Sequence, residues 1–370
     1  MSPTRSTTVA PTTAAISPAL APACEADSRA VLVPILSARL TIPRSAQSIP
    51  SVHLIGPGRV GRAFLRQLAA TNLRLVAVTD SRRTLHSAHG LDCTAAETSA
   101  PYGATQEASI PAALAIELVH ADIVVDCTAS DDASSAAAVE RAQAALSCGA
   151  QLVYASKAAP ARLLHQWLPH ANEVLRVGIN AACGGAGAAI LADDDIAAGR
   201  ALVVTVVGNA STTAFIDALE RGLSHDDAMS EVANLGLFEP NPQDDLRGRD
   251  TALKLCIAAQ AAGFGPCDPT RVPSANASAL NAALLQQRRR NGLTTRLVGR
   301  ISRDGPATVA YEELPRTSPL AVPGDRVAYA FTLQGGSLRL HLGACLGYEL
   351  TAQAVLQDVL AFAAARAVVS

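Results

Sequence analysis

The chain has 370 residues, 49% of them apolar and 17% charged, which is enough to bury a sizeable core in one large domain or two ordinary ones. The formal net charge of −2 argues against a polyanion-binding surface, and no apolar run reaches the roughly 18 residues that a membrane-spanning helix requires. The eight cysteines include no CxxC pair and no metal-ligand spacing. Because Cys127, Cys148 and Cys256 lie in apolar surroundings, we predict buried, reduced thiols and a soluble protein of the cytoplasm.

Residues 1–48 differ in composition from the rest of the chain. They are rich in Ser, Thr, Ala and Pro, have Glu25 and Asp27 as their only acids, and contain one short apolar segment, 31–42. This composition fits a disordered or poorly structured extension, a transit-like segment, or the remnant of a preceding domain. The sequence does not choose among these three.

A dinucleotide-binding pattern follows. The apolar run 52–55 predicts a buried parallel strand, 62–70 has a helical period, and 73–78 predicts a second strand. The sequence GPGRVG stands between the first strand and the helix, and an acid follows about 20 residues later. Glycines there permit a tight turn and a close approach of a pyrophosphate to the helix N-terminus, so we predict a dinucleotide site. The alternative interpretation of the same glycines is a purely structural turn. The predicted cofactor contacts of this segment are Gly56, Gly58, Arg59, Val60, Gly61 and Asp80.

The residues after the second strand leave the type of dinucleotide open. Asp80 is suited to the ribose hydroxyls of NAD, but Arg82 and Arg83 follow it and are suited to the additional phosphate of NADP. Both cofactors therefore stay possible at this point.

The alternation of strands and helices continues. A strand at 122–125 leads into the sequence DCTAS, a helix is expected at 133–147, and a further strand at 151–154 is followed closely by Lys157. This pattern predicts a doubly wound parallel sheet, in which ligands bind at the carboxyl ends of the strands. The additional predicted cofactor contacts are Thr128, Ala129, Ser130 and Lys157.

Lysine is rare in this chain, since only Lys157 and Lys254 stand among its 30 basic residues. Lysine offers a compact ammonium that exchanges its proton readily, which arginine does not. Lys254 lies in a predicted helix, 250–262, where Asp250 precedes it by four residues and shares its face. The acids Glu239, Asp244 and Asp245 precede this helix, so we predict a catalytic cluster around Lys254 rather than an exposed ion pair.

The remaining segments carry less chemical information. The eight histidines show no metal-ligand spacing, no GxSxG motif suggests a hydrolase, and the identity of any bound metal stays unknown. Alternating segments at 327–333 and 338–342, joined through Gly335 and Gly336, predict antiparallel strands of a second sheet.

Five segments together resemble the homoserine dehydrogenase family. GLFEPNPQDDLRGRDTALK, residues 236–254, is similar to the substrate-site signature of that family, and GPGRVGRAFLRQL resembles its nucleotide loop. DCTAS, SKAAP and TAQAVLQDVL resemble its third nucleotide-side strand end, its first-lysine segment and its closing helix. The resemblance spans 51–366 in the correct order. It is strongest to the dehydrogenase half of bacterial aspartokinase–homoserine dehydrogenases.

The resemblance implies an α/β protein with a doubly wound parallel-sheet dinucleotide-binding domain, 49–180 completed by a C-terminal helix in 345–370, and an α+β substrate and dimerisation domain, 181–344. It implies NADP as cofactor, with NAD possible, and a homodimer that binds neither nucleic acid nor membrane. The reaction would be reversible reduction of aspartate 4-semialdehyde to homoserine, in the biosynthesis of threonine and methionine. The roles carried over are catalysis for Lys254 and Lys157, substrate binding for Glu239, Asp245, Asp250 and Ser211, and cofactor binding for Gly347.

Several positions depart from the family pattern. The glycine-rich segment 180–189 lacks the acid and proline that the family has there, which bears on monovalent-cation binding, and Leu253 replaces the arginine before Lys254. One alternative is therefore a catalytically weak or silent relative that acts by binding or regulation. A second is another reductase of amino-acid metabolism with a similar nucleotide domain.

Overall fold

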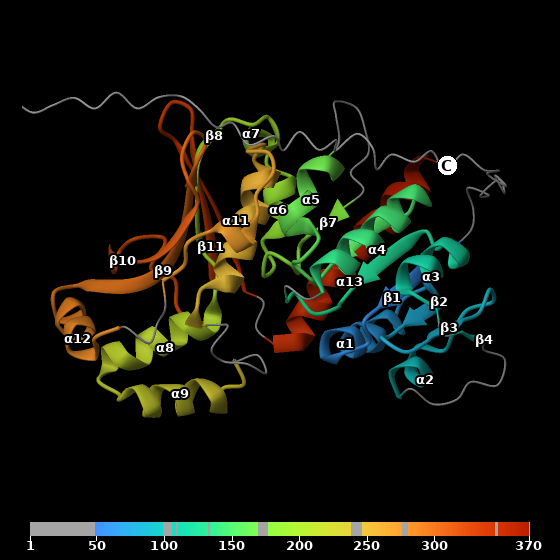
Figure 1. Ribbon diagram of the computed structural model, residues 1–370, viewed down its shortest axis with the longest axis horizontal. Helices are drawn as coiled ribbons and strands as arrows, with labels where there is room; N and C mark the ends of the chain where they lie inside the picture. The colour runs from blue at the N-terminus through green and yellow to red at the C-terminus, as the bar shows by residue number, and fades with distance from the viewer. Residues whose placement is uncertain are drawn as a thin grey trace, which may run out of the picture. The chain divides into compact units, whose positions relative to one another are not determined.

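The computed structural model describes residues 49–98, 106–108, 110–131, 134–168, 177–237, 246–275, 280–344 and 347–369 (Figure 1). All of them belong to one compact unit, Ala46–Ser370. The extension predicted for 1–48 lies outside the described residues.

The first half of this unit is built on a seven-stranded sheet with the order β4-β3-β2-β1-β5-β6-β7. The five neighbouring strands β2, β1, β5, β6 and β7 pair in parallel. At one edge, β3 pairs antiparallel with β2, and β4 pairs antiparallel with β3. The central strands are short and buried along their whole length, as expected for a parallel sheet covered on both faces. The strands are β1 (Ser51–Ile55), β2 (Arg74–Thr79), β3 (Thr84–His86), β4 (Gln106–Ala108), β5 (Ile123–Asp126), β6 (Gln151–Tyr154) and β7 (Val177–Gly178).

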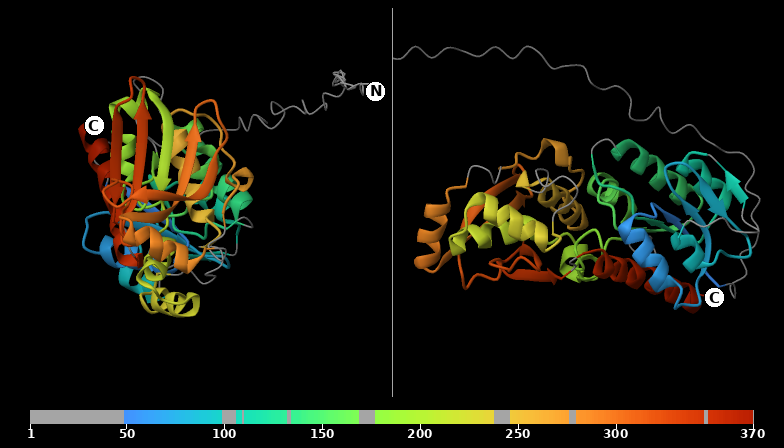
Figure 2. Two further views of the ribbon diagram at one scale, coloured as in Figure 1. Left: turned by 90° about the vertical axis from the view of Figure 1, so that its left-hand side faces the viewer. Right: turned by 90° about the horizontal axis from the view of Figure 1, so that it is seen from below.

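Helices cover both faces of this sheet. Along β5, Ile123 and Val125 pack with the residues of α1 and α13, whereas Val124 between them packs with those of α3 and α4. The helix α13 comes from the far end of the chain and lies against α1 (Figures 1 and 2). The helices of this half are α1 (Arg59–Leu68), α2 (Cys93–Thr98), α3 (Ala112–Val119), α4 (Ser135–Ser147), α5 (Pro160–Trp167) and α13 (Gly347–Val369).

The second half is built on an antiparallel five-stranded sheet with the order β10-β9-β8-β11-β12. Tyr329 and Phe331 on one face pack in a common core with Leu255 and Ile257, so α11 (Arg249–Ala261) covers this inner face. The left view of Figure 2 shows the opposite, outer face of β8, β11 and β12 without a covering helix. The strands are β8 (Ala201–Val207), β9 (Leu293–Ser302), β10 (Thr308–Pro315), β11 (Val327–Leu333) and β12 (Leu338–Gly343).

The helices of the second half include α11, which contacts α5 as well as β8 and β9. Because one core cluster contains residues from both sheets, α11 joins the two halves. The other helices lie around the second sheet and in the connections to it. The bounds of these other helices are α6 (Gly187–Leu191), α7 (Asp194–Ala197), α8 (Ala210–Arg221), α9 (His225–Asn234), η1 (Pro269–Arg271) and α12 (Ala282–Arg290).

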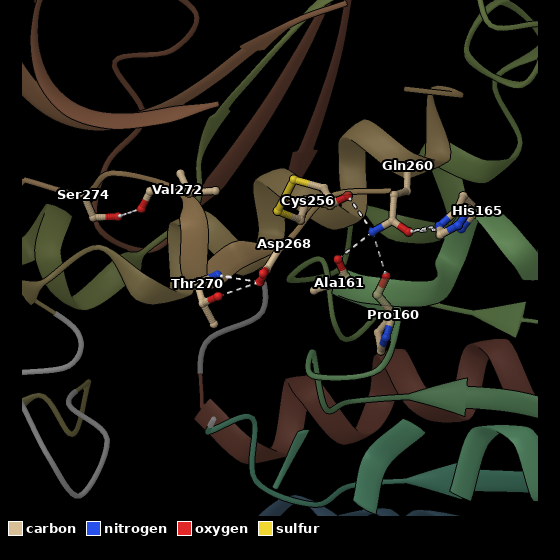
Figure 3. Close-up of a disulfide and its surroundings, with 10 residues drawn as sticks. Pro160, Ala161, His165, Cys256, Gln260, Asp268, Thr270, Val272 and Ser274 are labelled. Carbon is tan, nitrogen blue, oxygen red and sulfur yellow. Dashed lines mark hydrogen bonds between the residues drawn. A yellow bond between two sulfur atoms is a disulfide. The ribbon is translucent and has the colours of Figure 1, made fainter. Parts of the chain in front are cut away.

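The fold class predicted from the sequence is confirmed, and each predicted strand or helix lies within a few residues of an observed one. The prediction for Cys256 is wrong, because this residue forms a disulfide with Cys267 (Figure 3). The chain turns back after α11 and brings the two Cα atoms to 5.3 Å across 11 residues, a pairing that no short spacing motif indicates. Cys127 and Cys148 are free cysteines, as predicted, but the prediction that they are buried is wrong, because both are only partly buried.

Candidate active site

The glycine-rich loop connects β1 to α1 at the carboxyl end of the parallel sheet. Gly56 has a φ of +84°, and a Cβ there would lie 2.9 Å from the backbone of Cys127 and Thr128. A Cβ on Gly61 would lie 2.4 Å from the carbonyl oxygen of Gly56, whereas one on Gly58 would meet nothing within 4 Å. Two glycines thus permit close packing of the loop, and the third leaves open space at the helix N-terminus, where a pyrophosphate fits.

The acid after β2 organises its own turn. One Asp80 carboxylate oxygen, Oδ1, accepts hydrogen bonds from the backbone N–H groups of Arg82 and Arg83, at 2.7 and 2.9 Å. The other oxygen, Oδ2, lies 3.9 Å from Nε of Arg83. Asp80 therefore holds the two arginines beside it in one turn, and Arg82 is exposed.

A buried ion pair supports the second predicted cofactor loop. Asp126, at the end of β5, accepts a bond of 2.9 Å from Nε of Arg141 and bonds of 2.9 and 2.6 Å from the backbone and hydroxyl of Thr128. Arg141 also donates to the Thr128 hydroxyl at 2.7 Å. The Ser130 hydroxyl accepts a 2.8 Å bond from the backbone N–H of Lys157, which ties this loop to the loop after β6. Ala129 between them is exposed.

The two lysines of the chain meet at one carboxylate. Oδ1 of Asp250 lies 3.1 Å from Nζ of Lys157, and Oδ2 lies 2.7 Å from Nζ of Lys254. Lys254 also donates to the carbonyl of Gly208, a residue whose own Cβ would lie 3.1 Å from the lysine stem. The side chains of Lys157, Asp250 and Lys254 are only 16%, 18% and 10% exposed. The site therefore contains two ammonium groups and one shared counter-ion with little access to water.

The pKa of Asp250 reflects this arrangement. Burial would raise the pKa of the carboxyl group, but the charges of Lys157 and Lys254 and the hydrogen bonds that they donate outweigh burial and lower it to about 2. Asp250 also stands in the first turn of α11, where the helix dipole favours a negative charge. The carboxylate therefore stays ionised at neutral pH.

Of the other predicted substrate contacts, the structure describes Ser211. The Ser211 hydroxyl, in the first turn of α8, donates to the side-chain oxygen of Asn209, and that same oxygen accepts a 2.9 Å bond from the backbone of Thr212. Since Asn209 directly follows Gly208, the start of α8 adjoins Lys254. Glu239, Asp244 and Asp245 lie outside the described residues.

Gly347 begins α13, whose first turn contacts the far end of α1. The neighbouring residue Glu349 accepts a 3.0 Å backbone bond from Gln67 and pairs with Arg66, both in the last turns of α1. The glycine-rich loop lies before the first turn of the same helix. The cofactor contact predicted for Gly347 therefore stays a prediction.

Sequence reasoning missed Arg141, Gly208 and Asn209. Arg141 lies in the middle of α4, and nothing in the local pattern distinguishes it from a surface arginine. Asn209 has a recognisable signal, since it is an N-cap residue directly before a helix. Within the described ranges, no helix is long and apolar enough to cross a membrane, and no group of three His, Cys, Asp or Glu side chains is arranged to hold a metal ion.

A parallel sheet with a glycine-rich loop is joined to a second, antiparallel sheet, and a buried ammonium cluster lies between α11 and the loop after β6. This arrangement defines a two-part protein of the nicotinamide-dinucleotide-binding class. Two sequence-family models match the chain: homoserine dehydrogenase, NAD binding domain, over residues 56–176, and homoserine dehydrogenase over residues 190–360. The chain belongs to the homoserine dehydrogenase family.

Individual relatives agree with this assignment. A homoserine dehydrogenase of Methanocaldococcus jannaschii is 29% identical over 182 residues, which cover 49% of this chain and 54% of that protein. The bifunctional aspartokinase/homoserine dehydrogenase 2 of Escherichia coli is 32% identical over 149 residues, which cover 34% of this chain and 18% of that protein. The chain thus spans about half or less of the length of these curated relatives. A hyperthermophilic archaeal homoserine dehydrogenase solved in complex with NADPH has the same fold, with a TM-score of 0.68, 21% identity, and coverage of 85% of this chain and 97% of the other.

Proposed function

We propose that the protein is a homoserine dehydrogenase, which reduces L-aspartate 4-semialdehyde reversibly to L-homoserine with NADPH or NADH. The observation that carries this proposal is the cluster of Lys157, Asp250 and Lys254, in which two buried ammonium groups share one carboxylate. A catalytically silent relative would have no need to keep two charged lysines buried, because burying charged groups costs free energy even when they are paired. The intact cluster therefore favours the enzyme over the silent alternative.

The chemistry required of the protein is small and matches this cluster. The bound dinucleotide supplies a hydride when reduced, and the protein must orient the aldehyde and provide a proton. As negative charge develops on the carbonyl oxygen, an ammonium beside it both stabilises the charge and donates the proton. We assign the donor role to Lys254, with Lys157 stabilising the same oxygen and Asp250 keeping both ammonium groups in place.

Substrate binding is assigned to the residues around the cluster. Glu239 and Asp245 are proposed to bind the ammonium of the amino acid, as the family resemblance implies, and Ser211 to contact the substrate from the start of α8. In the opposite direction Lys254 would accept the proton from the homoserine hydroxyl. The same residues then serve oxidation and reduction, as reversibility requires.

The cofactor is proposed to lie across the carboxyl ends of β1, β2 and β5. The open space beside Gly58 and the N-terminus of α1 fits the pyrophosphate, with Arg59, Val60 and the loop at Thr128, Ala129 and Ser130 on either side. NADP is the proposed preference, because the turn at Asp80 presents Arg82 and Arg83 together. One carboxylate oxygen of Asp80 accepts the two backbone hydrogen bonds of that turn, so the carboxylate is less available to ribose hydroxyls.

Assembly and context complete the proposal. We propose a cytoplasmic homodimer in threonine and methionine biosynthesis, with a dinucleotide-binding domain at 49–180 completed by 345–370 and a substrate domain at 181–344. The outer face of the second sheet supports the dimer: Leu338 and Leu342 on β12 are 50% and 45% exposed. Their strand partners on β11, Thr332 and Ala328, extend the same face, and the segment carrying Val322 covers only part of it.

The direct test is an NADPH oxidation assay on the purified protein with L-aspartate 4-semialdehyde. We expect turnover in the unaltered protein and a loss in kcat of about 10²-fold or more in Lys254→Arg, because arginine keeps the charge but is a poor proton donor. Lys157→Arg should also impair turnover, since the wider guanidinium displaces the substrate. Absence of turnover in a folded, dinucleotide-binding protein would favour the silent relative, and near-normal kcat in Lys254→Arg would remove Lys254 from the donor role.

A further inference from the structure

Gln260 is a fully buried polar side chain on α11, six residues after Lys254, and the mechanism above does not use it. Its amide nitrogen, Nε2, donates to the carbonyl oxygen of Ala161 at 2.6 Å and to those of Pro160 and Cys256 at 3.3 and 3.2 Å. Its amide oxygen, Oε1, accepts from the backbone N–H of His165 at 3.2 Å and lies 2.6 Å from Nδ1 of the same residue (Figure 3). All polar atoms of this side chain therefore have partners, and most of them lie on α5.

The orientation of this amide is fixed by its surroundings. Three carbonyl oxygens surround one end, so that end must be the NH₂ group, and the other end must be the oxygen. Nδ1 of His165 therefore carries a hydrogen, which it donates to the amide oxygen.

The contacts of Gln260 fall on the helix that continues from Lys157. The carbonyl of Ala161 and the N–H of His165 belong to one helical turn of α5, and the Gln260 amide touches both. The backbone N–H of Ala161 in turn donates to the carbonyl of Lys157 at 3.0 Å, so this turn is continuous with the lysine. Gln260 thus links α11, which carries Lys254 and Asp250, to the segment that carries Lys157.

We infer that Gln260 is a positioning residue: its buried amide fixes α5 against α11 and thereby holds the Lys157 ammonium at Asp250. The geometry of the cluster depends on this, because Lys157 comes from the first half of the molecule and Asp250 from the second. Apolar packing between α5 and α11 is present but does not set a unique register. Four hydrogen bonds between one amide and α5 do, two of them donated by Nε2 and two accepted by Oε1. The catalytic consequence rests on the proposed function, but the placement of Lys157 does not.

The scarcity of lysine gives a direct measurement. Protein labelled with ¹³C in the lysine side chains should show two Cε signals in NMR spectra, and the Lys254→Arg variant identifies the one from Lys157. In Gln260→Leu we expect the Lys157 signal to move from its position in the unaltered protein. We also expect kcat for aldehyde reduction to fall by about 10-fold or more, with a smaller change in KM, because a displaced ammonium affects the reacting geometry.

A matched control separates positioning from a general loss of stability. Gln151 is also a buried glutamine, at the start of β6 and at the opposite end of that strand from Lys157. Gln151→Leu should leave the Lys157 signal in place. If Gln260→Leu does not fold, His165→Phe removes only the Nδ1 bond and should move the signal in the same direction by less.

The two claims fail separately. A Lys157 signal that stays in place in Gln260→Leu, or in His165→Phe where the first variant does not fold, would overturn the positioning role. A protein that reduces no aldehyde would overturn the proposed function, and the NMR comparison would still decide on Gln260.

Discussion

Replacing Asp250 by asparagine tests the shared counter-ion directly, because the side chain keeps its size and loses only its charge. Folding lowers the pKa of this carboxyl group from 3.8 to about 2. At about 1.4 kcal/mol for each tenfold change in the equilibrium, that difference amounts to roughly 2 kcal/mol of stability at neutral pH. Removing the carboxylate also leaves two buried ammonium groups unpaired, and breaking a buried ion pair costs about 3–5 kcal/mol. We therefore expect Asp250→Asn to lower the free energy of unfolding by about 2–5 kcal/mol.

The pH dependence follows from the direction of the pKa change. A carboxyl group whose pKa is lower in the folded state stabilises the fold above its unfolded-state pKa, and this contribution is lost as the pH falls through the folded-state pKa. For Asp250 the window runs from 3.8 down to about 2. The stability difference between the unaltered protein and Asp250→Asn should therefore be constant near neutral pH and shrink below about pH 4.

Urea denaturation of both proteins at a series of pH values measures this difference. Glu312→Gln serves as the control, because the pair of Glu312 with Arg300 is exposed and such pairs contribute about 0–1 kcal/mol. The kcat of Asp250→Asn should fall by about 10²-fold, since neither lysine keeps its position. A stability loss no larger than that of Glu312→Gln, or a difference that does not change between pH 7 and pH 3, would refute the shared counter-ion.

Three further outcomes are expected. Arg82→Ala combined with Arg83→Ala should raise KM for NADPH much more than KM for NADH, because only NADPH carries the phosphate; equal losses would contradict the assignment. Deleting residues 1–45 should leave the melting temperature and kcat nearly unchanged, because their composition predicts no core; a fall of many degrees would show that they pack on the body. Leu342→Arg should convert the proposed dimer into monomers in analytical ultracentrifugation, because it places a charge on the outer sheet face; an unchanged dimer would exclude that face.

The elements that the sequence predicted well are those defined by local pattern. The strand at 52–55, its glycine loop and the helix after it can be predicted because burial, turn geometry and helical period are all encoded within 20 residues. The same holds for β11 and β12, where alternation and a glycine pair mark a hairpin. The short strands β3 and β4 were not predicted, because three residues are too few to show a period.

Contacts between segments that are distant in the sequence could not be predicted from local sequence pattern. The bond between Arg141 and Asp126, the disulfide of Cys256 with Cys267, and the amide of Gln260 on α5 all depend on how the chain returns to itself. Each involves a residue type that is ordinary at its place in the sequence. Position in space, and not residue type, gives these side chains their roles.

The charge of the lysine cluster gives a physical reason why the two lysines and Asp250 occur together. Two ammonium groups and one carboxylate carry a net charge of +1, so an oxygen that becomes negative during reduction meets a complementary site. After Lys254 donates its proton, Lys157 and Asp250 still form a neutral pair, so no lone carboxylate is left in a site with little access to water. A single lysine with the same aspartate would begin neutral and end with an isolated buried carboxylate, which is costly. The second lysine therefore makes proton transfer by the first compatible with burial.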